Sequence, residues 1–193
     1  MIAIVKYNAG NIRSVKNALD RIGVESVITD DPETLRNADK VIFPGVGEAG
    51  TAMKYLNERG LDKVIKSLTQ PFLGICLGMQ LMCAHSEEKD TTCLGIFKEK
   101  VRKFPPKGIV PHMGWNDFTQ VKGPLFEGIT PSDNMYFVHS YYAELGEDTV
   151  GETDYLIPFT SALQKDNFYG VQFHPEKSAD IGQKLIENFL NIK

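Results

Sequence analysis

Residues 71–80 read Pro-Phe-Leu-Gly-Ile-Cys-Leu-Gly-Met-Gln, a pattern typical of a strand that turns sharply into a helix. A short apolar strand is expected over residues 72–75 and a helix over 77–84, with Cys76 at the junction. The segment from Gly74 to Gly78 therefore has the glycine-x-nucleophile-x-glycine form of a nucleophile elbow. Glycines on either side leave room where other side chains would collide. Such a turn would lift the cysteine out of the sheet.

The helix that starts at Leu77 would direct its amide dipoles at the Cys76 sulfur, which favours the thiolate. The backbone N–H of Leu77 is also placed to donate to an oxyanion. A different interpretation is that Cys76 is a small buried residue and that the two glycines serve packing only. The five-residue motif alone leaves both interpretations open.

A cysteine nucleophile needs a base, and residues 170–178 supply a candidate in Gly-Val-Gln-Phe-His-Pro-Glu-Lys-Ser. His174 ends an expected strand, and Pro175 fixes the backbone after it. Glu176 could reach the imidazole nitrogen that faces away from the sulfur, set the tautomer and stabilise the imidazolium. Cys76, His174 and Glu176 are therefore predicted to form a catalytic triad.

The segments around the elbow alternate between strand and helix patterns. Strands are expected over residues 2–6, 24–29, 40–43 and 72–75, and helices over 12–22, 49–58, 61–68 and 77–84. In the second half, strands are expected over 96–104, 117–121, 135–138, 159–163 and 168–173, followed by a helix over 181–190. The sequence thus predicts an α/β fold: an open mixed, mostly parallel sheet flanked by helices, with an antiparallel extension in the second half. One domain over residues 1–193 is expected.

The composition disfavours several classes of function and location. A net charge of −4 over 193 residues does not favour nucleic-acid binding. There is no apolar stretch long enough for a membrane span and no secretory leader pattern at the start. The three cysteines lack a disulfide-like spacing, so reduced thiols in a cytoplasmic protein are expected.

The remaining titratable residues suggest no metal or cofactor. Cys83 and Cys93 have no histidine at metal-ligand spacing, so free thiols are expected. His85 is interpreted as a solvated helix-end residue and His112 as a structural residue. The basic run over residues 98–107 is interpreted as a solvated edge strand. Trp115, the sole tryptophan, is expected in a turn-like segment, where both a core residue and an interface anchor are open interpretations.

Residues 71–80 together with Gln172–Glu176 resemble the class I, or triad, glutamine amidotransferases. The resemblance implies an open α/β sheet and a cysteine that attacks the carboxamide of L-glutamine, releasing ammonia and leaving a glutamyl thioester. Residues 44–47, Pro-Gly-Val-Gly, are similar to the family's oxyanion strand. Gly47 and Leu77 would supply the oxyanion donors. In the free chain, the Val46–Gly47 peptide is expected to be able to point its N–H away from the site.

Three further segments (7–15, 110–116 and 136–142) resemble the glutaminase subunits of imidazole glycerol phosphate synthases, and the resemblance covers residues 1–193. It implies a heterodimer with a cyclase subunit, a (β/α)8 barrel that receives the ammonia. The whole enzyme would make imidazole glycerol phosphate and an aminoimidazole carboxamide ribotide in histidine biosynthesis. The resemblance assigns glutamine binding to Gln80, Glu88, His139, Ser140 and Tyr141, and the partner interface to Asn11, Trp115 and Lys177.

Other functions remain open at this point. The chain could be the glutaminase subunit of another synthase, for anthranilate, aminodeoxychorismate or a surface-sugar amidation. It could also be a non-catalytic binding module on the same scaffold, which the intact triad disfavours. A cysteine peptidase is a further alternative, although Gln80 and Glu88 suit a small amino acid better than a peptide.

Overall fold

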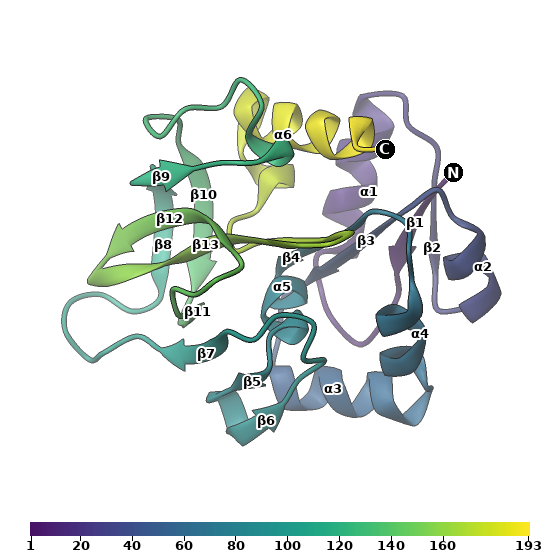
Figure 1. Cartoon of the computed structure of the whole chain (residues 1–193), viewed down its shortest axis with the longest axis horizontal. Coiled ribbons are helices and arrows are strands. Elements are labelled where there is room, and N and C mark those ends of the chain that lie inside the picture. The colour runs from purple at the N-terminus through teal and green to yellow at the C-terminus, as the bar shows by residue number, and fades with distance from the viewer.

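A central sheet organises the computed structural model, which describes residues 1–193 (Figure 1). Its core is a run of five mutually parallel strands. In spatial order they are β2 (Ser26–Thr29), β1 (Ile2–Val5), β3 (Lys40–Gly45), β4 (Phe72–Cys76) and β14 (Phe168–Val171). Every residue of β1, β4 and β14 is buried, as expected for parallel strands that are covered on both faces.

Helices cover both faces of this parallel core. Alternate side chains of β1 enter two different apolar clusters, with Ile2 and Ile4 in one and Ala3 and Val5 in the other. The first cluster is closed by α1 (Ile12–Arg21) and α6 (Ala179–Asn191), which lie together above the sheet in Figure 1. The second is closed by α2 (Pro32–Asn37), α3 (Ala49–Glu58), α4 (Leu61–Ser67) and α5 (Leu77–Met82).

Beyond β14 the sheet continues mainly through antiparallel pairs. The further strands are β13 (Ile157–Lys165), β11 (Tyr141–Ala143), β7 (Lys100–Lys103), β5 (His85–Ser86) and β6 (Thr91–Thr92), with β12 (Thr149–Tyr155) and β9 (Gln120–Val121) on a branch from β13. A separate antiparallel ribbon joins β8 (His112–Asn116) to β10 (Met135–His139). Short 3-10 turns complete the chain at η1 (Glu88–Asp90), η2 (Pro124–Phe126) and η3 (Pro175–Lys177).

The predicted fold class is confirmed, with differences in the second half. The strand expected over 96–104 is formed only over Lys100–Lys103, and the one over 117–121 only over Gln120–Val121. Residues 135–138 do form a strand, but in the separate ribbon and not in the extension of the main sheet. Trp115 was expected in a turn, yet it lies within β8. The helix α2 and strand β12 were not predicted.

The interpretation of the basic run as an edge strand is wrong. Its strand β7 lies between β11 and β5, so both of its edges are paired. Arg102 forms ion pairs with Glu144 and Glu87, and these acidic partners account for a basic side chain on an interior strand. The interpretation of His85 is also wrong, because this residue belongs to strand β5 and contacts Asp90.

None of the helices is sufficiently long and apolar to cross a bilayer. The single domain over residues 1–193 stays a prediction, and the continuous hydrogen-bonded sheet from β2 to β6 is consistent with it.

Candidate active site

The predicted site residues meet where three neighbouring parallel strands end. Gly45 at the end of β3 pairs in register with Cys76 at the end of β4, and β14 pairs with β4 on the other side. The chain after β14 leads within three residues to His174. Open α/β sheets bind ligands at the carboxyl ends of their strands, so the topology itself assembles this site.

Cys76 adopts the strained backbone of an elbow, with φ 54° and ψ −111°. A positive φ is costly for a residue with a side chain and marks functional turns. The flanking positions require glycine, because a side chain at either one would collide with neighbouring atoms. A Cβ on Gly78 would lie 1.8 Å from the carbonyl oxygen of Phe43, and one on Gly74 would lie 2.8 Å from the backbone nitrogen of Met79. The tight turn predicted from residues 74–78 is therefore present.

His174 and Glu176 are both buried next to this elbow. Nδ1 of His174 lies 2.8 Å from Oε1 of Glu176. Because the carboxylate accepts, this contact places a proton on Nδ1. Nε2 is buried without an aligned hydrogen-bond partner, which leaves it available to the sulfur of Cys76.

The charges around His174 favour the imidazolium. Burial alone would lower the pKa of His174, but the hydrogen bonds and negative charges of Cys76 and Glu176 outweigh it and raise the pKa to about 10. A raised pKa of this kind is expected where a thiolate and an imidazolium form a pair.

Two side chains that support the triad were not recognised from the sequence in that role. Ser178 donates to the His174 carbonyl oxygen at 2.6 Å and accepts from the backbone N–H of Tyr136 at 2.9 Å, so it fixes the histidine to strand β10. Asn11 was expected only at the partner interface, but its side-chain amide donates to the Glu176 carboxylate and lies 3.3 Å from Nδ1 of His174.

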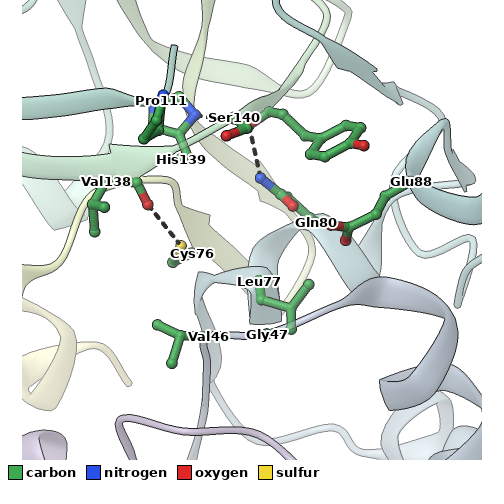
Figure 2. A pocket seen from close by; sticks show the side chains of 11 residues that line it. Val46, Gly47, Cys76, Leu77, Gln80, Glu88, Pro111, Val138, His139 and Ser140 are labelled. Carbon is green, nitrogen blue, oxygen red and sulfur yellow. Dashed lines mark hydrogen bonds between the residues drawn. The ribbon is translucent and has the colours of Figure 1, made fainter.

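A cavity of about 290 Å³ opens at the Cys76 sulfur (Figure 2). Its volume suits an amino acid better than a peptide. It is lined by Val46, Gly47, Cys76, Leu77, Gln80, Glu88, Pro111, Val138, His139, Ser140 and Tyr141. All five residues predicted to bind glutamine and both predicted oxyanion donors are in this set, so the structure brings them together with the nucleophile.

The end of the cavity at Gln80 and Glu88 presents hydrogen-bond acceptors. Nε2 of Gln80 donates to the Tyr141 carbonyl oxygen at 2.9 Å (Figure 2). It also donates to Oε1 of Gln172 at 2.9 Å, which leaves the Gln80 amide oxygen unengaged. Glu88 accepts from the backbone N–H of Ala49 at 2.8 Å. Burial raises the pKa of Glu88 above its ordinary value. An amide oxygen and a partly desolvated carboxylate together suit an ammonium group.

The wall formed by residues 138–141 is held by a pair of buried histidines. His139 Nδ1 lies 2.7 Å from the Tyr141 carbonyl oxygen, and its Nε2 lies 3.0 Å from Nδ1 of His112. Burial lowers the pKa of His112 to about 4 and that of His139 to about 3, so both rings are neutral at pH 7. Both nitrogens of His139 are engaged, and this residue therefore supports the wall. The structural interpretation of His112 agrees with its contacts.

The loop after β3 carries the proposed oxyanion donors. The carbonyl oxygen of Val46 accepts from the N–H of Gly10 at 3.0 Å. In a trans peptide the C=O and N–H point in opposite directions, so this bond also fixes the direction of the Gly47 N–H. Gly47 has φ 138°, which favours glycine. Reorientation of this peptide stays a prediction, and it would require the bond to Gly10 to break.

The three residues predicted at the partner interface differ in exposure. Trp115 is 55% exposed on β8, packs edge-on against Tyr136 and lies two residues after the exposed Met113 on the same strand. Lys177 is exposed, whereas the amide of Asn11 is directed at the triad.

Cys83 and Cys93 are buried free thiols, and burial raises the pKa of Cys93 to about 12.

Comparison with known proteins agrees with this geometry. The family model for glutamine amidotransferase class-I matches residues 3–192. The chain therefore belongs to the class-I glutamine amidotransferase family. Solved structures with the same fold include a glutamine amidotransferase (TM-score 0.74, 21% identity, 98% of this chain and 97% of that chain) and PurLQS from Thermotoga maritima (TM-score 0.73, 16% identity, 98% and 97%).

Within the class, the chain is similar over its full length to proteins named imidazole glycerol phosphate synthase subunit HisH. That of Bacteroides fragilis is 59% identical over 99% of both chains. That of Methanococcus maripaludis, named HisH 1, is 48% identical over the whole of both chains. By their names, these relatives are each one subunit of a synthase.

Proposed function

We propose that this chain is the glutaminase subunit of an imidazole glycerol phosphate synthase. It hydrolyses L-glutamine to glutamate and ammonia, and the ammonia is used by a cyclase subunit in histidine biosynthesis. The proposed reaction rests on one observation. Cys76 lies on a strained elbow beside the buried pair His174–Glu176 and lines a cavity of a size that suits an amino acid. The synthase is inferred from the full-length HisH relatives.

The reaction follows from the roles of the three triad residues. The Cys76 sulfur attacks the carboxamide carbon of glutamine, and a C–S bond forms as the carbonyl oxygen becomes an oxyanion. The imidazolium of His174 then protonates the amide nitrogen, and the C–N bond breaks to release ammonia. Water deprotonated by His174 attacks the thioester, the C–S bond breaks, and glutamate leaves. Glu176 stabilises the charged imidazole throughout.

The oxyanion and the substrate are held by groups that line the cavity. The N–H groups of Leu77 and Gly47 stabilise the oxyanion, because fixed donors aimed at developing charge lower the barrier. The Glu88 carboxylate and the Gln80 amide oxygen hold the α-ammonium of glutamine. The segment His139–Tyr141 holds the other end of the substrate.

The partner is a cyclase subunit, a (β/α)8 barrel, in a one-to-one heterodimer. Trp115 and Lys177 are exposed and supply contacts to the cyclase subunit. Asn11 links this face to the triad, because its side-chain amide donates to the Glu176 carboxylate. The names of the full-length relatives, each one subunit of a synthase, support a separate acceptor subunit.

Copurification tests the choice of synthase. The tagged chain, expressed in its own cells, is expected to retain one barrel subunit at a one-to-one ratio. Adding that subunit is expected to raise glutamate release from glutamine. Recovery of an adenylating sugar amidotransferase, or of an anthranilate or aminodeoxychorismate synthase component, would overturn the assignment to the histidine pathway.

A further inference from the structure

The side chain of Gln172 is fully buried beside the triad and has no role in the reaction as described above. It follows β14 and lies two residues before His174. Its amide nitrogen lies 3.6 Å from the sulfur of Cys76, which is within hydrogen-bond distance for sulfur. The reacting sulfur therefore has a polar neighbour besides His174.

The orientation of this amide follows from its neighbours. The Tyr141 carbonyl oxygen can only accept, so the group of Gln80 that faces it at 2.9 Å is the NH2. The same NH2 lies 2.9 Å from the Gln172 amide, which must therefore present its oxygen. The NH2 of Gln172 is left to face the sulfur. A flipped amide at either residue would oppose two acceptors or two donors.

We propose that Gln172 is a further catalytic residue, whose side-chain N–H donates to the Cys76 sulfur, stabilises the thiolate and holds it toward the cavity. This role rests on the proposed glutaminase function. An N–H donor gains more from a charged acceptor than from a neutral one, so the contact favours the thiolate over the thiol. Gln80 lines the cavity and fixes the Gln172 amide, so one wall of the glutamine pocket also orients the nucleophile.

Substitution at Gln172 separates this role from packing. In Gln172→Glu the carboxylate still accepts from Gln80, but it cannot donate to the sulfur. Gln172→Met preserves most of the volume and removes both hydrogen bonds. Ser161→Ala is the matched control, because Ser161 is also buried, its backbone carbonyl accepts from the Gln172 backbone N–H, and its hydroxyl has no partner to lose.

The measurement is the rate of Cys76 alkylation by iodoacetamide as a function of pH, on the full chain, by mass spectrometry of the peptide that contains Cys76. Loss of a hydrogen bond to the thiolate is expected to move the pH midpoint of alkylation upward by about one unit in Gln172→Met. A larger upward shift is expected in Gln172→Glu, because its carboxylate also repels the thiolate. Ser161→Ala is expected to retain the wild-type midpoint. Circular dichroism identifies a variant that fails to fold. If one of the two Gln172 variants does not fold, the folded one is used for the test.

Two outcomes would overturn the proposal: wild-type midpoints in the folded Gln172 variants, or an equal shift in Ser161→Ala. Glutamate release by the wild-type chain with its cyclase partner is measured in parallel. If the wild type releases no glutamate, the proposed function fails. If the wild type is active and the Gln172 midpoints are unchanged, only the role of Gln172 fails. In active variants, kcat is expected to fall roughly tenfold, with little change in KM for Gln172→Glu.

Discussion

At the scale of single residues, the site depends on a few buried charges whose neighbours set their protonation. His174 has a pKa raised to about 10, and Glu88 has a pKa raised by burial. Both shifts suit the proposed roles. A charged imidazole is able to protonate the leaving amide nitrogen, and a carboxylate in a partly dry pocket binds an ammonium strongly.

Glu176→Gln tests the orienting role of the carboxylate. The substitution keeps the size of the side chain but removes the negative charge that accepts from Nδ1 of His174. We expect kcat for glutamate release to fall roughly 10²–10⁴-fold, because the imidazolium loses its stabilising partner. Steady-state kinetics of the complex with the cyclase subunit measure this. Activity close to that of the wild type would show that the histidine does not need Glu176.

Glu88 gives a prediction about pH. Because its pKa is raised, this carboxyl gains a proton at a higher pH than an ordinary glutamate, and the neutral form cannot pair with the α-ammonium of glutamine. KM for glutamine is therefore expected to rise as the pH falls through the Glu88 pKa. Glu88→Gln is expected to raise KM roughly 10–100-fold at pH 7 and to remove this dependence. Initial rates measured over a series of pH values test this prediction. If KM keeps its pH dependence in Glu88→Gln, Glu88 is not the cause of that dependence.

The residue types of the triad could be predicted from the sequence because each belongs to a short motif. Cys76 lies between two glycines, and His174 precedes Pro175 and Glu176. Ser178 and Gln172 were not given roles, because their contacts are with residues 42 and 96 positions away along the chain. The dual position of Asn11, beside both Glu176 and the proposed interface, likewise depends on tertiary contacts.

At the level of secondary-structure elements, the junction between β4 and α5 positions the nucleophile. The close approach of α5 to β3 requires Gly78, since a Cβ there would overlap the Phe43 carbonyl oxygen. The strand and helix on either side of Cys76 were predicted correctly, because their patterns are local and strongly apolar. The ribbon of β8 and β10 was only partly predicted, since its pairing joins segments about twenty residues apart and β8 includes Gly114 and Asn116.

Gly78→Ala tests this junction. The added methyl group must push α5 away from β3, so we expect a loss of about 3 kcal/mol in the free energy of unfolding together with a loss of glutaminase activity in the folded fraction. The control is Gly23→Ala, where φ is 73° but no atom lies within 4 Å of the added carbon. That variant is expected to lose about 1–2 kcal/mol and to keep its activity. Chemical denaturation with parallel activity assays compares the two. Equal activity in both would contradict the account of the elbow.

In the whole molecule, the carboxyl ends of the parallel strands hold the nucleophile, and the antiparallel half supplies a wall of the cavity and an outer face. Trp115 and Met113 are exposed on β8, on the ribbon whose other strand, β10, leads into the cavity wall at Val138 and His139. The parallel core could be predicted because most of its strands, such as β1 and β4, are short apolar runs. The arrangement of the antiparallel half depends on long-range pairing that periodicity does not encode.

Trp115→Ala tests the proposed docking face. Large aromatic side chains often dominate the binding energy of interfaces, so we expect the affinity for the cyclase subunit to fall by about 2–4 kcal/mol, roughly 30- to 1000-fold. Leu145→Ala is the control, because Leu145 is 46% exposed and lies outside the predicted interface. Titration calorimetry with the purified cyclase subunit measures both. An unchanged affinity in Trp115→Ala would place the docking face elsewhere.

In the proposed function Cys76 generates ammonia from glutamine, and Cys76→Ala removes this nucleophile. Glutamate release is measured for the chain mixed with glutamine and its cyclase subunit, with Cys83→Ala, a second buried thiol, as the control. Cys76→Ala is expected to lower turnover roughly 10³-fold or more, because the covalent route is lost, whereas Cys83→Ala is expected to remain active. Glutamate release by Cys76→Ala at the wild-type rate would show that Cys76 is not the nucleophile.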